Sequence, residues 1–155
     1  MMRTPPQPDG WRLGPHLAGG LTLCHYPAFR ACDTLPALKE RIAAELPEYV
    51  RYGIHVMAAQ NHLGEVVIGD SHEYDGDIEP FDKPRIDELI LTYLRSLVRL
   101  PGWEVAGRWH GLYAKHPDRP LVRSEPQRGV TVLAGVGGMG MTLSFGLADE
   151  FWDTE

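Results

Sequence analysis

A glycine pattern near the end of the chain limits the fold more than any other feature. A short apolar run at residues 130–134 leads into Gly135-x-Gly137-x-x-Gly140 and then into a helix-like stretch. This spacing is typical of a strand-to-helix turn that holds phosphate, because glycines allow close backbone approach and helix N-termini favour negative charge. The chain ends fifteen residues later, at Glu155, so the second strand and distal acidic residue of a complete dinucleotide domain are not expected. The turn is either a terminal piece of a larger cofactor site or a simple tight turn.

Composition narrows the function classes. A chain of 155 residues with 43% hydrophobic and 23% charged residues is typical of one globular domain with its own core. The net charge of −6 and the scattered Lys and Arg argue against nucleic acid as a partner. No apolar run reaches the roughly 18–20 residues that span a bilayer, and the N-terminus lacks a signal-peptide core. Cys24 and Cys32 fit neither a metal spacing nor a disulfide framework, so the cytoplasm is the expected location.

Hydrophobic periodicity and turn residues predict an α+β fold with a mostly antiparallel sheet and two helices, followed by a terminal strand–glycine turn–helix. Prolines and glycines make residues 1–15 look irregular. The expected elements are a strand at 21–26, a helix at 35–46 capped by Thr34, a hairpin of 54–59 with 65–69, a helix at 84–98, and strands at 103–113 and 130–134. The last strand has no evident neighbour, so we expect it to be an edge or orphan strand.

An acidic loop spans residues 70–84. Its Asp75-x-Asp77-x-Glu79 resembles a calcium loop superficially, but Pro80 stands where that loop needs glycine, so a solvated loop is favoured. His72 and Glu73 are an alternative acid–base or metal-binding pair, although adjacent residues on an extended strand face opposite ways. No H-x-x-x-H pair on a helix and no G-x-S-x-G elbow is present, which argues against a hydrolase.

A second polar and aromatic cluster lies in residues 108–118, RWHGLYAKHPD. On a strand, His110, Leu112 and Ala114 would face one way and Tyr113 and Lys115 the other. This segment is either an aromatic-rich core strand or one wall of a pocket.

Residues 111–118 (GLYAKHPD) and 135–142 (GVGGMGMT), together with the middle segment GIHVMAAQNHLGEVVIGDSHEY, carry a family resemblance. Their order and spacing resemble the C-terminal part of the D-amino-acid-oxidase-like (glycine/sarcosine oxidase) family of FAD-dependent oxidoreductases. The nearest subgroup is one linked to the catabolism of phosphonate compounds. The resemblance covers nearly the whole chain.

The resemblance implies a fragment of a flavoenzyme. Residues 1–110 would be part of a substrate domain and residues 111–155 the C-terminal segment of the FAD domain, without the N-terminal βαβ unit that binds the ADP half of FAD. The flavin-lining residues would be Gly135, Gly137, Gly138, Met139, Gly140, Met141 and Thr142. Their N–H groups would favour the negative charge that develops near N1/O2 of a reduced flavin.

Four departures from the family pattern qualify this expectation. Tyr113 stands where glycine-oxidase-like members have a carboxylate-binding Arg. Gly111 stands where sarcosine-oxidase-like members tether flavin through cysteine, so the FAD would be non-covalent. Thr142 and Val67 stand where those members have lysines, which puts an α-amino carboxylate substrate and fast reaction with oxygen in doubt. Tyr113, Lys115 and His116 are candidates to bind another anion, such as a phosphonate.

Three hypotheses remain open. In the first, the chain is a fragment of an oxidase or dehydrogenase acting on a C–N bond of a small amine, with Tyr113 and His72 at the substrate wall. It would be inactive alone and would depend on a separate chain carrying the ADP-binding half, or on a homo-oligomer. In the second, it is a stand-alone α+β binding or interaction module. In the third, it is a metal-dependent enzyme that uses His72 and Glu73.

Overall fold

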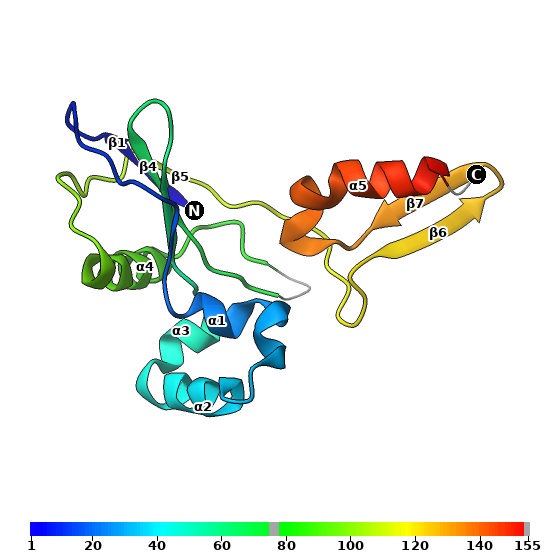
Figure 1. The fold of residues 1–155 in the computed structure, drawn as a ribbon, viewed down its shortest axis with the longest axis horizontal. Coiled ribbons are helices and arrows are strands. Elements are labelled where there is room, and N and C mark those ends of the chain that lie inside the picture. Colours follow the sequence, from blue (N-terminus) through cyan, green and yellow to red (C-terminus); the bar gives the residue numbers. More distant parts are fainter. Residues whose placement is uncertain (75–77, 154–155) are drawn as a thin grey trace. The chain divides into compact units, whose positions relative to one another are not determined.

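The structure is a computed structural model that describes residues 1–74 and 78–153. It divides into two compact units, Met1–His110 and Gly111–Glu155 (Figure 1). The assignment of residues 1–110 to a substrate domain and of residues 111–155 to a flavin domain stays a prediction.

The described residues of unit 1 form a five-stranded antiparallel sheet in the order β2-β3-β4-β1-β5, together with four α-helices and a 3-10 helix (Figure 1). The strands are β1 Met2–Pro6, β2 Leu17–Ala18, β3 Met57–Gln60, β4 Glu65–Gly69 and β5 Gly107–Arg108. The helices are α1 Thr22–His25, η1 Pro27–Ala31, α2 Leu35–Glu45, α3 Pro47–Arg51 and α4 Pro84–Leu97.

The core of unit 1 forms where helix α4 packs on the sheet. Pro84 lies at the start of α4, where its missing N–H costs nothing. Apolar residues then recur every three or four positions, and Ile90 and Leu94 are only 1% exposed. Val66 and Ile68 of β4 belong to the same core and are fully buried. Apolar residues that recur every three or four positions on α4 therefore pack in one layer against apolar residues that recur every second position on β4.

Strand β1 corrects the expectation that residues 1–15 are irregular. Met2 and Arg3 pair with β4, and the register then shifts before Pro6. At the shift, the buried Thr4 hydroxyl accepts hydrogen bonds from Val66 N (3.0 Å) and Gln7 Nε2 (3.1 Å). The Thr4 hydroxyl thus replaces part of the backbone hydrogen bonding between strands that the prolines interrupt. The number of prolines in the sequence does not reveal this replacement.

Two other strand predictions were wrong or too long. Where a strand was expected over residues 21–26, Thr22–His25 form helix α1; the Thr22 hydroxyl donates to Gly19 O (2.5 Å), and Leu21 is buried in the core. Tertiary packing thus overrides the β propensity of this segment. The strand expected over 103–113 is reduced to β5, because only Gly107 and Arg108 pair with β1.

Unit 2 consists of a two-stranded antiparallel hairpin and a helix. Its elements are β6 Val122–Gln127, β7 Val130–Ala134, the 3-10 turn η2 Gly137–Met139 and α5 Gly140–Asp153. The expectation of an orphan final strand was wrong, because β7 pairs with β6. Prolines and charges in residues 119–128 concealed this partner strand.

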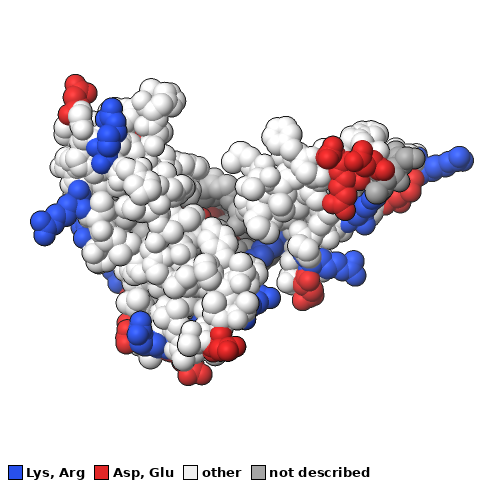
Figure 2. All heavy atoms as spheres, in the orientation of Figure 1, with Lys and Arg blue, Asp and Glu red and all other residues white. Residues whose placement is uncertain are grey.

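The expected α+β class with a mostly antiparallel sheet is confirmed, with five α-helices among the described residues. The two short helices α1 and α3 were not predicted. Figure 2 shows Lys and Arg dispersed among Asp and Glu on the face in view, in keeping with the net charge of −6. Within the described residues, no helix combines the length and apolar character needed to cross a bilayer.

Candidate functional site

The glycine turn of unit 2 joins β7 to α5. Gly135 and Gly137 have φ angles of +80° and +62°, a region that side chains with a Cβ rarely adopt. Gly140 needs glycine for a different reason, since a Cβ there would lie 2.9 Å from Val136 Cγ2. Backbone strain and close packing therefore account for three of the glycines that the sequence singled out.

Residues 113–116 lie against this turn. Lys115 and Val136 form an isolated antiparallel bridge, His116 N donates to Gly135 O (3.3 Å), and Gly137 N donates to Ala114 O (3.2 Å). A Cβ built on Gly138 would lie 3.7 Å from the Tyr113 hydroxyl. The structure thus brings Tyr113, Lys115 and His116 together with the glycine turn.

His116 has a local structural task as well. Its Nδ1 atom accepts hydrogen bonds from the backbone N–H groups of Asp118 (3.1 Å) and Arg119 (3.0 Å). This holds the bend at residues 117–120 and leaves Nε2 as the ring atom for any contact with a ligand.

His72 belongs to unit 1, where it joins a cluster of three histidines and an aspartate. The Nε2 atoms of His55 and His72 are 2.9 Å apart, and the two rings are parallel within 1°. Asp70 Oδ1 lies 3.4 Å from His55 Nε2, and Asp70 Oδ2 lies 3.2 Å from His72 Nε2. The His25 ring stacks on both histidines, with centroids 3.8 Å from His55 and 4.6 Å from His72.

The cluster is shielded from solvent. The side chain of His55 is 2% exposed, that of His72 13% and that of Asp70 22%. Burial lowers the pKa of His55, against the opposing charge of Asp70. Burial raises the pKa of Asp70, but the hydrogen bond from His72 and the neighbouring histidines outweigh it and lower the net pKa. At neutral pH the cluster therefore holds an anionic carboxylate beside a neutral imidazole.

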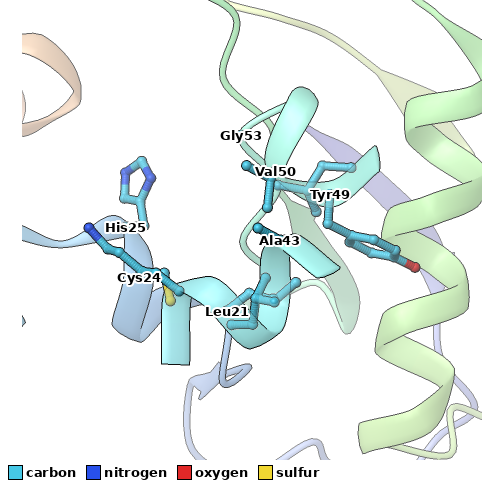
Figure 3. Close-up of a pocket in the computed structure, with 10 residues that line it drawn as sticks. Leu21, Cys24, His25, Ala43, Tyr49, Val50 and Gly53 are labelled. Atoms are coloured by element: carbon cyan, nitrogen blue, oxygen red, sulfur yellow. The ribbon is translucent and has the colours of Figure 1, made fainter. Parts of the chain in front are cut away.

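A cavity of about 360 Å³ lies beside His25. Figure 3 shows His25 at one end of it and Tyr49 at the other, with residues of α1, α2 and α3 between them. Its lining is mainly apolar and includes Leu21, Ile42 and Ile54. A cavity of this size and character suits a small, largely apolar group.

Comparison with known proteins identifies the family. The family model described as FAD dependent oxidoreductase (DAO) matches residues 21–153, which takes in parts of both units. The chain belongs to this FAD-dependent oxidoreductase family. No match was found among curated proteins or solved structures.

The glycine turn fits one wall of an FAD site. Gly138 is exposed and has no side chain to keep a planar ligand away from the backbone. Helix α5 runs for 14 residues from Gly140 and has no acidic residue in its first turn, so its N-terminal N–H groups keep their preference for negative charge. In this family member, the backbone of residues 135–142 is therefore suited to lie against the edge of a flavin ring that carries partial negative charge.

Sequence reasoning did not find His25, His55 or Asp70. The three histidines come from α1, from the segment before β3 and from the segment after β4, so no short motif joins them. The hairpin carried only a partial signal, because its register, extended past Met57 and Gly69, would put His55 opposite Ser71. In the structure the pairing is shifted by one residue, and the backbones of His55 and Asp70 exchange hydrogen bonds of 3.1 and 2.9 Å.

The remaining candidates of the acidic loop have other surroundings. Glu73 does not appear in the cluster around His72; its Oε1 atom accepts a hydrogen bond from Lys83 Nζ (2.6 Å). Asp75 and Asp77 of the calcium-like pattern lie outside the described residues. His110, from the second cluster, pairs with Asp82 (Nδ1–Oδ1 2.7 Å).

Proposed function

We propose that this chain is one part of an FAD-dependent enzyme that oxidises a C–N bond of a small amine. The observation that carries the proposal is the family match over residues 21–153, which ends on the strand, glycine turn and helix of unit 2. Bound FAD would accept a hydride from the substrate, which carries the two electrons of the oxidation. The protein groups bind and orient the reactants and set the charge around them.

In this proposal, the turn of unit 2 lines the flavin through Gly135, Gly137, Gly138, Met139, Gly140, Met141 and Thr142. Tyr113, Lys115 and His116 contact this turn and supply an aromatic ring, an ammonium and an imidazole for the substrate wall. Tyr113 and His72 stay our candidates for catalytic residues. Because Gly111 offers no nucleophile, we propose that FAD is held non-covalently.

An anionic amine is the proposed substrate type. Tyr113 stands at the place where glycine-oxidase-like relatives have an Arg that binds the substrate carboxylate, so a bidentate Arg–carboxylate interaction is not available there. The carbons of the Lys115 side chain lie against the glycine turn, and this side chain ends in an ammonium, a point charge that suits a phosphonate oxygen. This supports a place in the phosphonate-linked subgroup. The cytoplasm remains the proposed location, with Cys24 and Cys32 both free thiols.

We also propose that the flavin site is incomplete in this chain. Among the described residues of unit 2, none is buried. The exposed fractions on α5 reach 89% at Met141, 87% at Phe145 and 70% at Trp152. Such a surface is typical of a part that packs on another element. The proposed occupant is a chain carrying the ADP-binding half of the site, with a second copy of this chain as the other candidate.

A flavin spectrum with and without that half tests the proposal. The chain is purified alone, and again after co-expression with the coding DNA that adjoins its own reading frame. We expect a colourless chain alone, and a complex or longer product with a flavin band whose absorbance falls when small amines are added without oxygen. A co-expressed product that never holds flavin, or a flavin that no amine reduces, would contradict the proposal.

One observation favours the alternative of a stand-alone binding module. Unit 1 has its own sheet, core and 360 Å³ cavity, so it is equipped to fold and to bind a small apolar ligand without a flavin. Under this alternative, adjacent coding DNA adds neither flavin nor oligomerisation, and the chain unfolds cooperatively as a monomer. Two measurements distinguish the two hypotheses: denaturant unfolding reports cooperativity, and size-exclusion chromatography of the folded chain reports its oligomeric state.

A further inference from the structure

The proposed flavin chemistry uses His72, but it does not explain why His25, His55 and Asp70 gather around this residue. One ligand atom from each of the three histidines can be chosen so that all lie within 4.8 Å of one another. The Asp70 carboxylate adds two oxygens, with Oδ2 3.2 Å from His72 Nε2 and Oδ1 3.4 Å from His55 Nε2. Three separate chain segments thus converge on one point.

The unsatisfied polar atoms of the cluster favour a cation at this point. The Nε2 atoms of His55 and His72 face each other at 2.9 Å, and the line between two ring nitrogens has room for one proton at most. Asp70 Oδ1 is buried and has no hydrogen-bond partner among the described residues, and the same is true of His55 Nδ1. A buried carboxylate oxygen is therefore left unsatisfied beside the two facing Nε2 atoms, which is costly and which a bound cation would relieve.

We propose that these four residues bind a divalent transition-metal ion, with Zn²⁺ the best match. Imidazole nitrogens and a carboxylate oxygen are ordinary zinc ligands, and Zn–N and Zn–O bonds are about 2.0–2.2 Å long. Tetrahedral ligands at those lengths stand about 3.3 Å apart. The observed separations of 2.9, 3.2 and 3.4 Å around His55, His72 and Asp70 are close to this value.

His25 is the fourth ligand. It is half-buried at the last position of α1, and its ring lies over both His55 and His72 at an angle of 26° to each. To coordinate the ion, the His25 ring rotates from this stacked position until the lone pair of one ring nitrogen points at the ion. The site links α1 to the two segments at the open end of the β3–β4 hairpin, and it does not depend on the proposed flavin function.

Metal titration of the whole chain tests the site. The protein is stripped with a chelator and then titrated with Zn²⁺ in competition with a chromophoric chelator, and metal content after dialysis is measured by mass spectrometry. We expect one Zn²⁺ per chain. Loss of an outer-shell partner alone weakens metal binding roughly 10–100-fold, so His72→Ala and His25→Ala are expected to lose at least this much.

His62→Ala is the matched control, because His62 is an exposed histidine on the β3–β4 turn. It is expected to bind Zn²⁺ as the unchanged chain does. Asp70→Asn keeps the shape of the side chain and removes its charge, so it tests the carboxylate even if a truncated histidine variant fails to fold. Circular dichroism identifies any unfolded variant. Less than one tenth of a Zn²⁺ per chain, or equal affinity in folded Asp70→Asn and His62→Ala, would overturn the proposal.

Discussion

The Nε2 atoms of His55 and His72 face each other at 2.9 Å, with Asp70 beside both. If a zinc ion links them, it binds the folded state and stabilises unit 1 by mass action. At a free Zn²⁺ concentration 100 times the Kd, the gain is about 2.7 kcal/mol, or roughly a 10 °C rise in the melting temperature. Differential scanning fluorimetry measures this rise. It should be present in the unchanged chain and in His62→Ala, and lost in His72→Ala; the same rise in all three chains would contradict the site.

Thr4→Val tests the polar link that completes strand β1. The Thr4 hydroxyl donates to Pro5 O (2.7 Å) and accepts from Val66 N and Gln7 Nε2, and the residue is fully buried. Valine keeps the volume but leaves the two donors without this partner, so unfolding should become easier by about 1–3 kcal/mol. Urea unfolding measures the loss. Thr4→Ser keeps the hydroxyl and should lose less; equal losses would show that the hydrogen bonds do not matter.

Tyr49 is expected to make the stability of unit 1 sensitive to alkaline pH. Its buried hydroxyl donates to Leu89 O (3.0 Å), and burial raises its pKa above the usual value of 10.0. The folded state therefore holds this proton more tightly than the unfolded state. The stabilisation is complete below pH 10 and is lost as the pH rises through the folded-state pKa.

Tyr49→Phe removes that proton. Urea unfolding at about pH 8 should show the unchanged chain more stable by about 1 kcal/mol, the usual contribution of one hydrogen bond. At about pH 11 this advantage should shrink, because ionised tyrosine is disfavoured in the folded state. An advantage that is constant or grows with pH would contradict this reasoning.

Two glycines of helix α5 form a matched pair of tests for unit 2. A Cβ on Gly140 would lie 2.9 Å from Val136, whereas a Cβ on Gly146 meets nothing within 4 Å. Gly146→Ala should stabilise the helix by about 0.5–1 kcal/mol, and Gly140→Ala should lose that gain to the clash. Amide hydrogen exchange along α5 measures both effects. The double variant Val136→Ala/Gly140→Ala should recover protection, and if it does not, packing is not the reason for Gly140.

The sequence predicted the elements whose local signals agree with their packing. Helix α4 was found because its apolar spacing and Pro84 are both typical of a helix start and a buried face. The β3–β4 hairpin was found because of its Asn61–Gly64 turn, where Gly64 has a φ of +81° and Asn61 Oδ1 accepts from the N–H groups of Leu63 and Glu65. In both cases, neighbours in the sequence decide the structure.

Elements that depend on distant partners were not predicted. Strand β1 exists because Thr4 bonds to Val66, 62 positions away, and its prolines argue against a strand. The histidine cluster likewise depends on how α1 docks beside the hairpin, which no spacing within the chain records. Only His72 of that cluster was selected from the sequence, and its partners Asp70, His55 and His25 became visible in the fold.

The most direct test of the proposed function is the visible absorption spectrum of the purified chain with added FAD, before and after gel filtration. If the chain supplies only one wall of the flavin site, the flavin band near about 450 nm separates from the protein on the column. It should stay with the protein only when the ADP-binding half is present. A band that remains with the chain alone would contradict the account of an incomplete site.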